Sequence, residues 1–286
     1  MKKILSIVIA LTMIMAMLVP FGIYASAAGP QVITSWAEIT DAKGNYKLGA
    51  DITADATFAS TFKGTLDGDG HTITVQNTMF AKVGEGATLK NFVLEGTVTC
   101  APFIKSAVKA TSEAPITIDN VISNVDANFA DNHAAFVAEI TEDTCIVMTD
   151  CVNNGDLSAT KQVGGFIGWT VKSATVIFDG CVNNGAIYTS KDHAGGFIGC
   201  LEGGKYNITF NSCANFGSVE GSSEAAGFVA FASGSGCTVT FNDCYSAGAL
   251  KNNTSKGDEK YSCSGFIARL KTGSSVIMND CLSNVP

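Results

Sequence analysis

Five cysteines recur at near-constant spacing along the C-terminal half of this chain, and a column of phenylalanines keeps step with them. Both columns repeat every 30 residues or slightly more, and both have a longer final interval. Two columns that shift together indicate one structural unit repeated along the chain. The columns comprise Cys151, Cys181, Cys213, Cys244 and Cys281, and Phe136, Phe166, Phe197, Phe228 and Phe266.

Each repeat carries two short motifs. Cys-Val-Asn-Asn-Gly occurs at 151–155 and 181–185, and Gly-Gly-Phe-Ile-Gly occurs at 164–168 and 195–199. Weaker copies follow both motifs, and Phe92 and Val121 extend the cysteine column toward the N-terminus. The repeat is therefore predicted to run from about residue 70 to the end of the chain.

The repeat unit has the pattern of short strands. Runs such as 174–178, 207–210 and 238–241 alternate with a period of two and are rich in β-branched and aromatic residues. Helical repeats of similar length require long runs with apolar residues at 3.6-residue spacing, and the sequence has none. Three short strands and three turns account for one unit, which is one coil of a parallel β-helix. The predicted fold class is therefore all-β, a single-stranded parallel β-helix.

Equivalent residues of adjacent coils should stack at the spacing of neighbouring strands, about 4.8 Å. The phenylalanine and cysteine columns are then structural ladders inside the coil. Asn153, Asn183 and Asn215 are placed to hydrogen-bond along the axis, and Ser246 and Ser283 continue their column.

The ten cysteines admit two interpretations. The five regularly spaced ones are expected to form a ladder of buried free thiols, because parallel side chains point the same way and suit a disulfide poorly. The alternative is at least one disulfide within the ladder, as export would permit. Zinc is not expected, because the chain has no Cys-x-x-Cys motif and only three histidines.

The N-terminus predicts export. Lys2 and Lys3 precede an apolar run that ends in small residues around Ala27, which is the pattern of a cleaved signal peptide, and an uncleaved anchor is the alternative. We predict a signal peptide at 1–27, an N-terminal cap and first coil at 28–70, and a β-helix repeat domain at 71–286. That domain is expected to be truncated or uncapped at its C-terminus. The predicted location is secreted or at the cell surface.

Composition narrows the class of partner. Charged residues make up 15% of the chain, the net charge is −8, and Arg269 is the one arginine. This balance argues against nucleic-acid binding. Neither a cofactor nor a metal site is predicted.

Candidate functional residues are few, and no catalytic residue is predicted. Asp150, Asp243 and Asp280 precede cysteines of the column, at strand ends where aspartate commonly forms turns. The final repeat holds a polar insertion at 251–261. Tyr245 and Tyr261, near this insertion, are the possible ligand-binding residues.

The segments at 48–52 and 64–73 resemble the opening of right-handed β-helix domains in secreted bacterial proteins, which are pectin-lyase-like in fold. The Gly-Gly-Phe-Ile-Gly copies are similar to the GLUG-type repeat of bacterial cell-surface proteins. The resemblance covers about residues 45 to 286. It implies a right-handed coil and an exported protein associated with adhesion or polysaccharides.

Three functions are compatible with these features of the sequence. The first is a non-catalytic secreted or cell-surface structural and binding solenoid, an adhesin-like module that recognises an extracellular glycan or protein. The second is a polysaccharide lyase or glycoside hydrolase of the β-helix class, so enzymatic activity stays open. The third is an extracellular matrix component that self-associates end to end.

Overall fold

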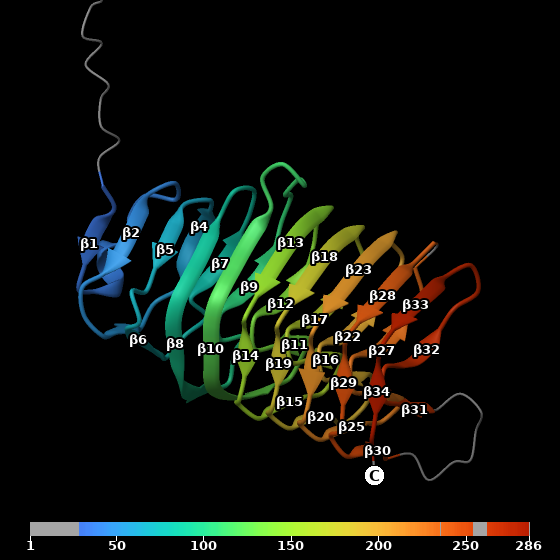
Figure 1. The fold of residues 1–286 in the computed structure, drawn as a ribbon. Helices are drawn as coiled ribbons and strands as arrows, with labels where there is room; N and C mark the ends of the chain where they lie inside the picture. Colours follow the sequence, from blue (N-terminus) through green and yellow to red (C-terminus); the bar gives the residue numbers. More distant parts are fainter. Residues whose placement is uncertain (1–28, 235, 254–261, 286) are drawn as a thin grey trace, which may run out of the picture.

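The computed structural model describes residues 29–234, 236–253 and 262–285, and these form a right-handed parallel β-helix (Figure 1). Strands pair in parallel with the equivalent strands of the coils before and after them, as Val152 does with Val182. The predicted fold class is confirmed. The helical content of the described residues is one short 3-10 turn, η1 (Trp36–Glu38), and none of their helices is long and apolar enough to cross a membrane.

Each regular coil consists of five short strand segments, where three had been expected. The segments of successive coils build five walls. The first wall is β13 (Thr144–Thr149), β18 (Ala174–Asp179), β23 (Tyr206–Asn211), β28 (Thr238–Asn242) and β33 (Ser275–Asn279). The second is β14 (Val152–Asn153), β19 (Val182–Asn183), β24 (Ala214–Asn215), β29 (Tyr245–Ser246) and β34 (Leu282–Ser283). The third is β15 (Leu157–Ala159), β20 (Ile187–Thr189), β25 (Val219–Gly221) and β30 (Leu250–Asn252).

The remaining two walls lie at the back of the view in Figure 1. The fourth is β11 (His133–Ala134), β16 (Val163–Gly164), β21 (Ala194–Gly195), β26 (Glu224–Ala226) and β31 (Ser262–Ser264). The fifth is β12 (Val137–Ile140), β17 (Ile167–Thr170), β22 (Ile198–Leu201), β27 (Val229–Ala232) and β32 (Ile267–Leu270).

The N-terminal coils are shorter and less regular. They contain β1 (Gln31–Ile33), β2 (Asn45–Leu48), β3 (Ile52–Ala54), β4 (Phe58–Phe62), β5 (Thr65–Asp67), β6 (Thr72–Val75), β7 (Phe80–Val83), β8 (Thr88–Val98), β9 (Ile104–Ala107) and β10 (Ile116–Phe129). The Trp36 indole donates a hydrogen bond to the Ala56 carbonyl at 2.7 Å and packs edge-on against Phe80. The predicted signal peptide lies outside the described residues.

One corner of every coil is made by a residue with left-handed backbone geometry. The position before the cysteine column has φ near +50° in Asp150, Asp243 and Asp280. Small polar residues and glycine tolerate this conformation, and Gly180 takes the same place in its own coil. The interpretation of these aspartates as turn formers is therefore confirmed. In the regular coils the bend lies between the first and second walls, whereas β8 and β10 continue through Asn91 and Asn120, which have the same left-handed geometry.

The glycine-rich motif allows the backbones of the fourth and fifth walls to approach each other closely. A Cβ atom on Gly164 would lie 2.1 Å from the Ile167 carbonyl oxygen, and one on Gly168 would lie 2.5 Å from the His133 carbonyl oxygen. Any side chain there would push the fourth wall away from the fifth, so the motif fixes the distance between them.

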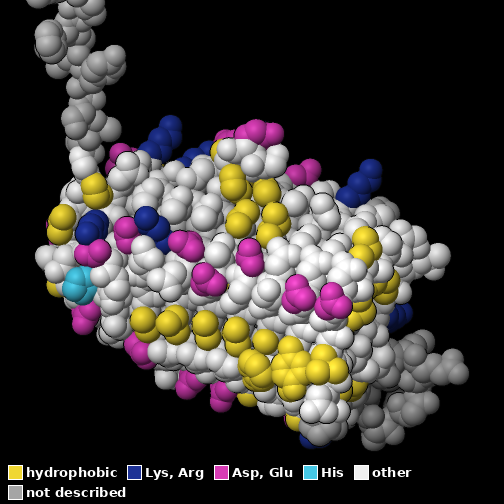
Figure 2. Space-filling model, in the orientation of Figure 1, with side chains coloured by type: hydrophobic (Ala, Val, Ile, Leu, Met, Phe, Trp, Pro, Cys, Tyr) yellow, Lys and Arg dark blue, Asp and Glu magenta, His cyan; other side chains and the backbone are white. Residues whose placement is uncertain are grey.

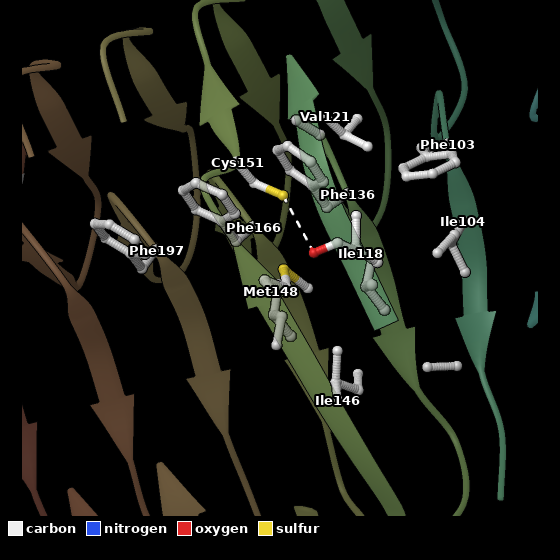
Figure 3. Packing of buried hydrophobic residues seen from close by; sticks show 14 of the residues in the cluster. Phe103, Ile104, Ile118, Val121, Phe136, Ile146, Met148, Cys151, Phe166 and Phe197 are labelled. Atoms are coloured by element: carbon white, nitrogen blue, oxygen red, sulfur yellow. Dashed lines mark hydrogen bonds between the residues drawn. The ribbon is translucent and has the colours of Figure 1, made fainter. Parts of the chain in front are cut away.

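The core consists of stacked rings (Figure 3). Phe166 and Phe197 stack with centroids 4.7 Å apart and planes 12° apart, and Phe197 and Phe228 stack at 4.6 Å and 2°. A second column of Phe178 and Phe210, from the first wall, meets this one edge to face. Each ring thus has stacked and perpendicular neighbours, an arrangement that adds to the burial of apolar area.

The asparagine ladder is also confirmed. The side-chain amide of Asn153 donates to the Asn183 carbonyl oxygen at 2.8 Å, and Asn183 donates to Asn215 at the same distance. All three residues are fully buried, so each bond pairs a donor with an acceptor that has no access to water, while the Asn153 carbonyl oxygen at the end of the ladder has no partner among the described residues.

Candidate functional site

The cysteine column lies inside the coil at the corner between the first and second walls. The Cys151 thiol points toward the Ile118 carbonyl oxygen at 3.5 Å, beside Phe136 and Phe166 (Figure 3). Cys281, in the last described coil, is half-buried. All ten cysteines are free thiols, and burial raises the pKa of the Cys151 thiol well above its usual value. The Cys151 thiol is therefore placed for packing and not for nucleophilic chemistry.

Tyr245 lies on the outside of the second wall, at the end of an apolar row. Figure 2 shows hydrophobic side chains following one another along this face and widening into a patch. Strand register aligns the row from coil to coil as Val93, Ile122, Val152, Val182, Ala214, Tyr245 and Leu282. The Phe216 ring lies edge-on to Tyr245 with centroids 5.7 Å apart, and Phe216 is 51% exposed. We call Phe216 and Tyr245 the aromatic ridge.

A second, exposed ladder of amides leads to this ridge. Asn184 donates to the Asn154 carbonyl oxygen at 2.8 Å, and Asn154 donates to Asn124 at 2.8 Å. Phe216 follows Asn215 just as Asn184 follows Asn183, so Phe216 takes the next place in this column. An exposed aromatic face therefore adjoins a row of hydrogen-bonding amides. Tyr261 and residues 254–260 of the insertion lie outside the described residues.

A buried carboxylate forms an ionic cluster on the opposite side of the coil. The Arg269 guanidinium donates to Glu224 Oε1 at 3.0 Å, and His193 Nδ1 approaches Oε2 to 2.5 Å, in a close contact and not an aligned hydrogen bond. The Glu224 side chain is 1% exposed. Burial opposes its charge, but the contacts with His193 and Arg269 outweigh this and lower the pKa of Glu224.

Phe231 completes the cluster. Its ring packs against His193 with centroids 4.7 Å apart, and the Arg269 guanidinium and the Lys271 ammonium lie 5.1 and 5.5 Å from its centre. Cation–π contacts of this kind fix the cations over the ring. The cluster thus joins three coils through one carboxylate and one ring.

This cluster was not predicted from the sequence. In the sequence Arg269 stands out only as the one arginine, and nothing singles out Glu224, Phe231 or Lys271. A signal was present, because Phe231 and Arg269 each lie three residues after a phenylalanine of the column, while His193 and Glu224 each lie four residues before one.

Neither of the buried histidines takes part in a metal site within the described residues, where no group of three or more His, Cys, Asp or Glu side chains is arranged to hold an ion. His133 is fully buried, and burial lowers its pKa to about 4. His193 is committed to Glu224.

A shallow groove runs along the solenoid where the first wall begins. Its floor is the outward column of Cys145, Thr175, Asn207 and Thr238, which strand register aligns over four coils. Lys109 and Lys205 line it together with Asp143. The groove is open, with a volume of about 560 Å³.

Comparison with known proteins supports the fold. No protein-family model and no curated protein matches the chain. Among solved structures it is similar to a crystal structure of a Bacteroides ovatus protein provisionally assigned as an immunoglobulin A1 protease, with a TM-score of 0.62 and 16% identity over 84% of each chain. At this identity the likeness shows the architecture, and both chains share the parallel β-solenoid.

Proposed function

We propose that the chain is an exported, non-catalytic binding solenoid that holds an extracellular glycan against the aromatic ridge. The observation that carries the proposal is the exposed Phe216 ring set against Tyr245, directly in line with the Asn154 and Asn184 amides. Sugar rings have apolar faces that pack on aromatic rings, while their hydroxyl groups bond to amides. The ridge and the amide ladder offer both kinds of contact side by side.

Three further features support this proposal. The signal-like N-terminus and the resemblance to GLUG-type surface repeats favour a location outside the cell. The solenoid holds Tyr245 on the paired strand β29, and the backbone N–H of Phe216, directly after β24, donates to the Asn183 carbonyl oxygen at 2.8 Å, which favours binding without reorganisation. Asp150, Asp243 and Asp280, which share one position of the repeat, are left-handed corners of the coil.

The test is glycan binding by the protein and by a Phe216→Ala/Tyr245→Ala variant. We expect immobilised polysaccharides to retain the protein and to retain the double variant at least tenfold more weakly. Trp169→Ala is the matched control, because Trp169 is a partly exposed aromatic residue on the fifth wall. Equal retention of the protein and the double variant, or retention lost in the Trp169 control, would refute the proposal. Release of soluble fragments from the polysaccharide would favour the enzymatic alternative instead.

A further inference from the structure

The exposed amide ladder that leads to the aromatic ridge has a single direction. Asn184 Nδ2 donates to Asn154 Oδ1, and Asn154 Nδ2 donates to Asn124 Oδ1, both at 2.8 Å. The series ends one coil earlier at Glu95, whose Oε1 accepts from Asn124 Nδ2 at 2.6 Å. Every donor of the ladder therefore points toward the N-terminal coils, and every amide oxygen points toward the ridge.

Glu95 fixes this direction by its chemistry. A carboxylate accepts hydrogen bonds and does not donate them, so Asn124 must turn its NH2 group toward Glu95 and its oxygen toward Asn154. Asn154 and Asn184 follow, because each amide oxygen needs an N–H group opposite it. A hydrogen bond to a carboxylate is stronger than one between two neutral amides, and hydrogen bonds in series polarise one another. The group at residue 95 thus orients three amides.

The buried amide ladder beside it shows that the coil does not dictate the direction. There Asn153 Nδ2 donates to Asn183 Oδ1, toward the C-terminal coils. Backbone carbonyl groups fix that ladder, since Asn153 also donates to the Gly155 carbonyl oxygen at 3.1 Å and Asn183 to the Gly185 carbonyl oxygen at 3.0 Å. The two ladders run in opposite directions, and each follows the acceptor that it meets.

The direction decides what the exposed ladder presents beside Phe216. Asn184 Oδ1 is the last oxygen of the series, and no group of the described residues donates to it. Asn184 is exposed, and Phe216 takes the next place in the column on the adjoining coil. A ligand can therefore reach an acceptor and an aromatic face at the same time.

We propose that Glu95 is a positioning residue for the glycan. By orienting the ladder it makes the ridge select a sugar that donates a hydroxyl hydrogen to Asn184 Oδ1 while the apolar face of the sugar lies on Phe216. This inference rests on the proposed function, because it concerns the same surface. Glu95 itself lies three coils before Asn184 and acts only through the amides between them.

The charges around the ladder favour a neutral glycan. Asp126 and Asp156 lie exposed two residues after the first two asparagines of the ladder, and Asp150 and Asp243 form exposed corners on the other side of the apolar row. Figure 2 shows acidic side chains on both sides of this row. These carboxylates repel a uronic acid or a sulfated sugar.

The experiment changes the group at residue 95 and the donor on the sugar. The probes are the methyl glycosides of glucose, galactose, mannose and N-acetylglucosamine and their mono-O-methyl ethers, because an ether oxygen accepts a hydrogen bond and cannot donate one. Saturation-transfer NMR measures their affinities. For the unmodified protein we expect one ether to bind about threefold to tenfold more weakly than its parent glycoside, the effect of one hydrogen bond.

Two variants at residue 95 test the direction of the ladder. Glu95→Gln can still accept from Asn124, so the preference for the parent glycoside should remain. Glu95→Lys can only donate, so it reverses the ladder and turns the Asn184 NH2 group toward Phe216. In this variant the ether should bind at least as tightly as its parent. Asp126→Lys is the matched control, because it makes the same change of charge beside the ladder and leaves the acceptor of Asn124 in place.

The outcomes separate this inference from the proposed function. The same preference in the unmodified protein and in Glu95→Lys, or a reversed preference in Asp126→Lys, would overturn the role of Glu95 even if Phe216→Ala/Tyr245→Ala still loses polysaccharide. Polysaccharide retention that does not depend on Phe216 and Tyr245 would refute the proposed function and this inference together. If Glu95→Lys fails to fold, the unmodified protein decides, because binding of no glycoside, or no loss with any ether, would also overturn the inference.

Discussion

Arg269 Nη1 lies 3.0 Å from Glu224 Oε1, and the two residues are 45 positions apart in the sequence. This bond crosses from β32 to the coil before it and satisfies a carboxylate that is 1% exposed. Replacing Arg269 with methionine keeps an unbranched apolar stem and leaves Glu224 without its guanidinium partner.

We expect Arg269→Met to lower the free energy of unfolding by about 1–3 kcal/mol, the usual cost of an unsatisfied buried polar group. Urea titration would measure it. Lys251→Met is the control, because Lys251 pairs with Glu220 at 3.3 Å on the surface, where ion pairs contribute about 0–1 kcal/mol. Equal losses in the two variants would show that Glu224 does not depend on Arg269.

The same carboxylate should make stability depend on pH. Burial opposes its charge, yet His193 and Arg269 lower the pKa of Glu224 below its value in the unfolded chain, about 4.3. A lowered folded-state pKa contributes stability above the unfolded-state value, and this contribution is lost as the pH falls through the folded-state value. The stability difference between the protein and Glu224→Gln should therefore shrink in urea titrations from pH 6 to pH 3. A constant difference would contradict this assignment.

The stacked phenylalanines should dominate the stability of the middle coils. Phe197 is fully buried between Phe166 and Phe228. Phe197→Ala should cost about 3–5 kcal/mol, because it removes a ring and leaves a cavity that the paired strands cannot close. Phe216→Ala removes a half-exposed ring and should change stability by no more than about 0.5 kcal/mol. Chemical denaturation of both variants checks the contrast, and similar costs would argue against it.

The two asparagine ladders provide a matched pair of substitutions. Asn183→Ala removes a buried amide that bonds to Asn153 and Asn215, and we expect a loss of about 1–3 kcal/mol. Asn184→Ala removes the adjacent, exposed amide. Its partner Asn154 can then hydrogen-bond to water, so the loss of unfolding free energy should stay within about 0.5 kcal/mol. Thermal unfolding of the two variants compares them directly. A larger loss for Asn184→Ala would show that burial does not set the strength of these ladders.

The thiols should react in the order of their exposure. Cys263 is exposed, while Cys151 is fully buried and burial raises its pKa. Alkylation of the folded protein should modify Cys263 first and leave Cys151 intact until denaturant is added. Raising the pH from 7 to 9 should accelerate the alkylation of Cys263 and not that of Cys151, because the reagent's access to the buried thiol limits the rate at Cys151. Peptide mass spectrometry would follow both, and early modification of Cys151 would show that the ladder opens.

The sequence predicted the features that repeat and missed those that occur once. The Phe166 and Asn183 columns were visible because each coil places the same residue at the same depth. Glu224 and Arg269 were not, because a different residue type occupies the equivalent position in each coil, so only the spacing from the phenylalanine column repeats.

Five segments per coil replaced the expected three for a local reason. The left-handed corner at Asp150 lies between β13 and β14, although β8 and β10 continue through equivalent corners at Asn91 and Asn120. A short strand, β16, ends at Gly164, where the backbone approaches β17 closely. The alternation of apolar residues along the sequence gives no sign of the corner at Asp150 or of the close approach at Gly164.

The identical corners have a consequence for how long such a molecule can be. Val152 pairs directly with Val182, and the same kind of bend precedes each. The span between them is therefore an interchangeable repeat unit. Duplicating it would lengthen the solenoid by one coil, about 4.8 Å, and deleting it would shorten the solenoid by one coil, while the other coils keep their own strand pairing. The number of coils before a surface such as the aromatic ridge thus sets how far that surface lies from the start of the solenoid.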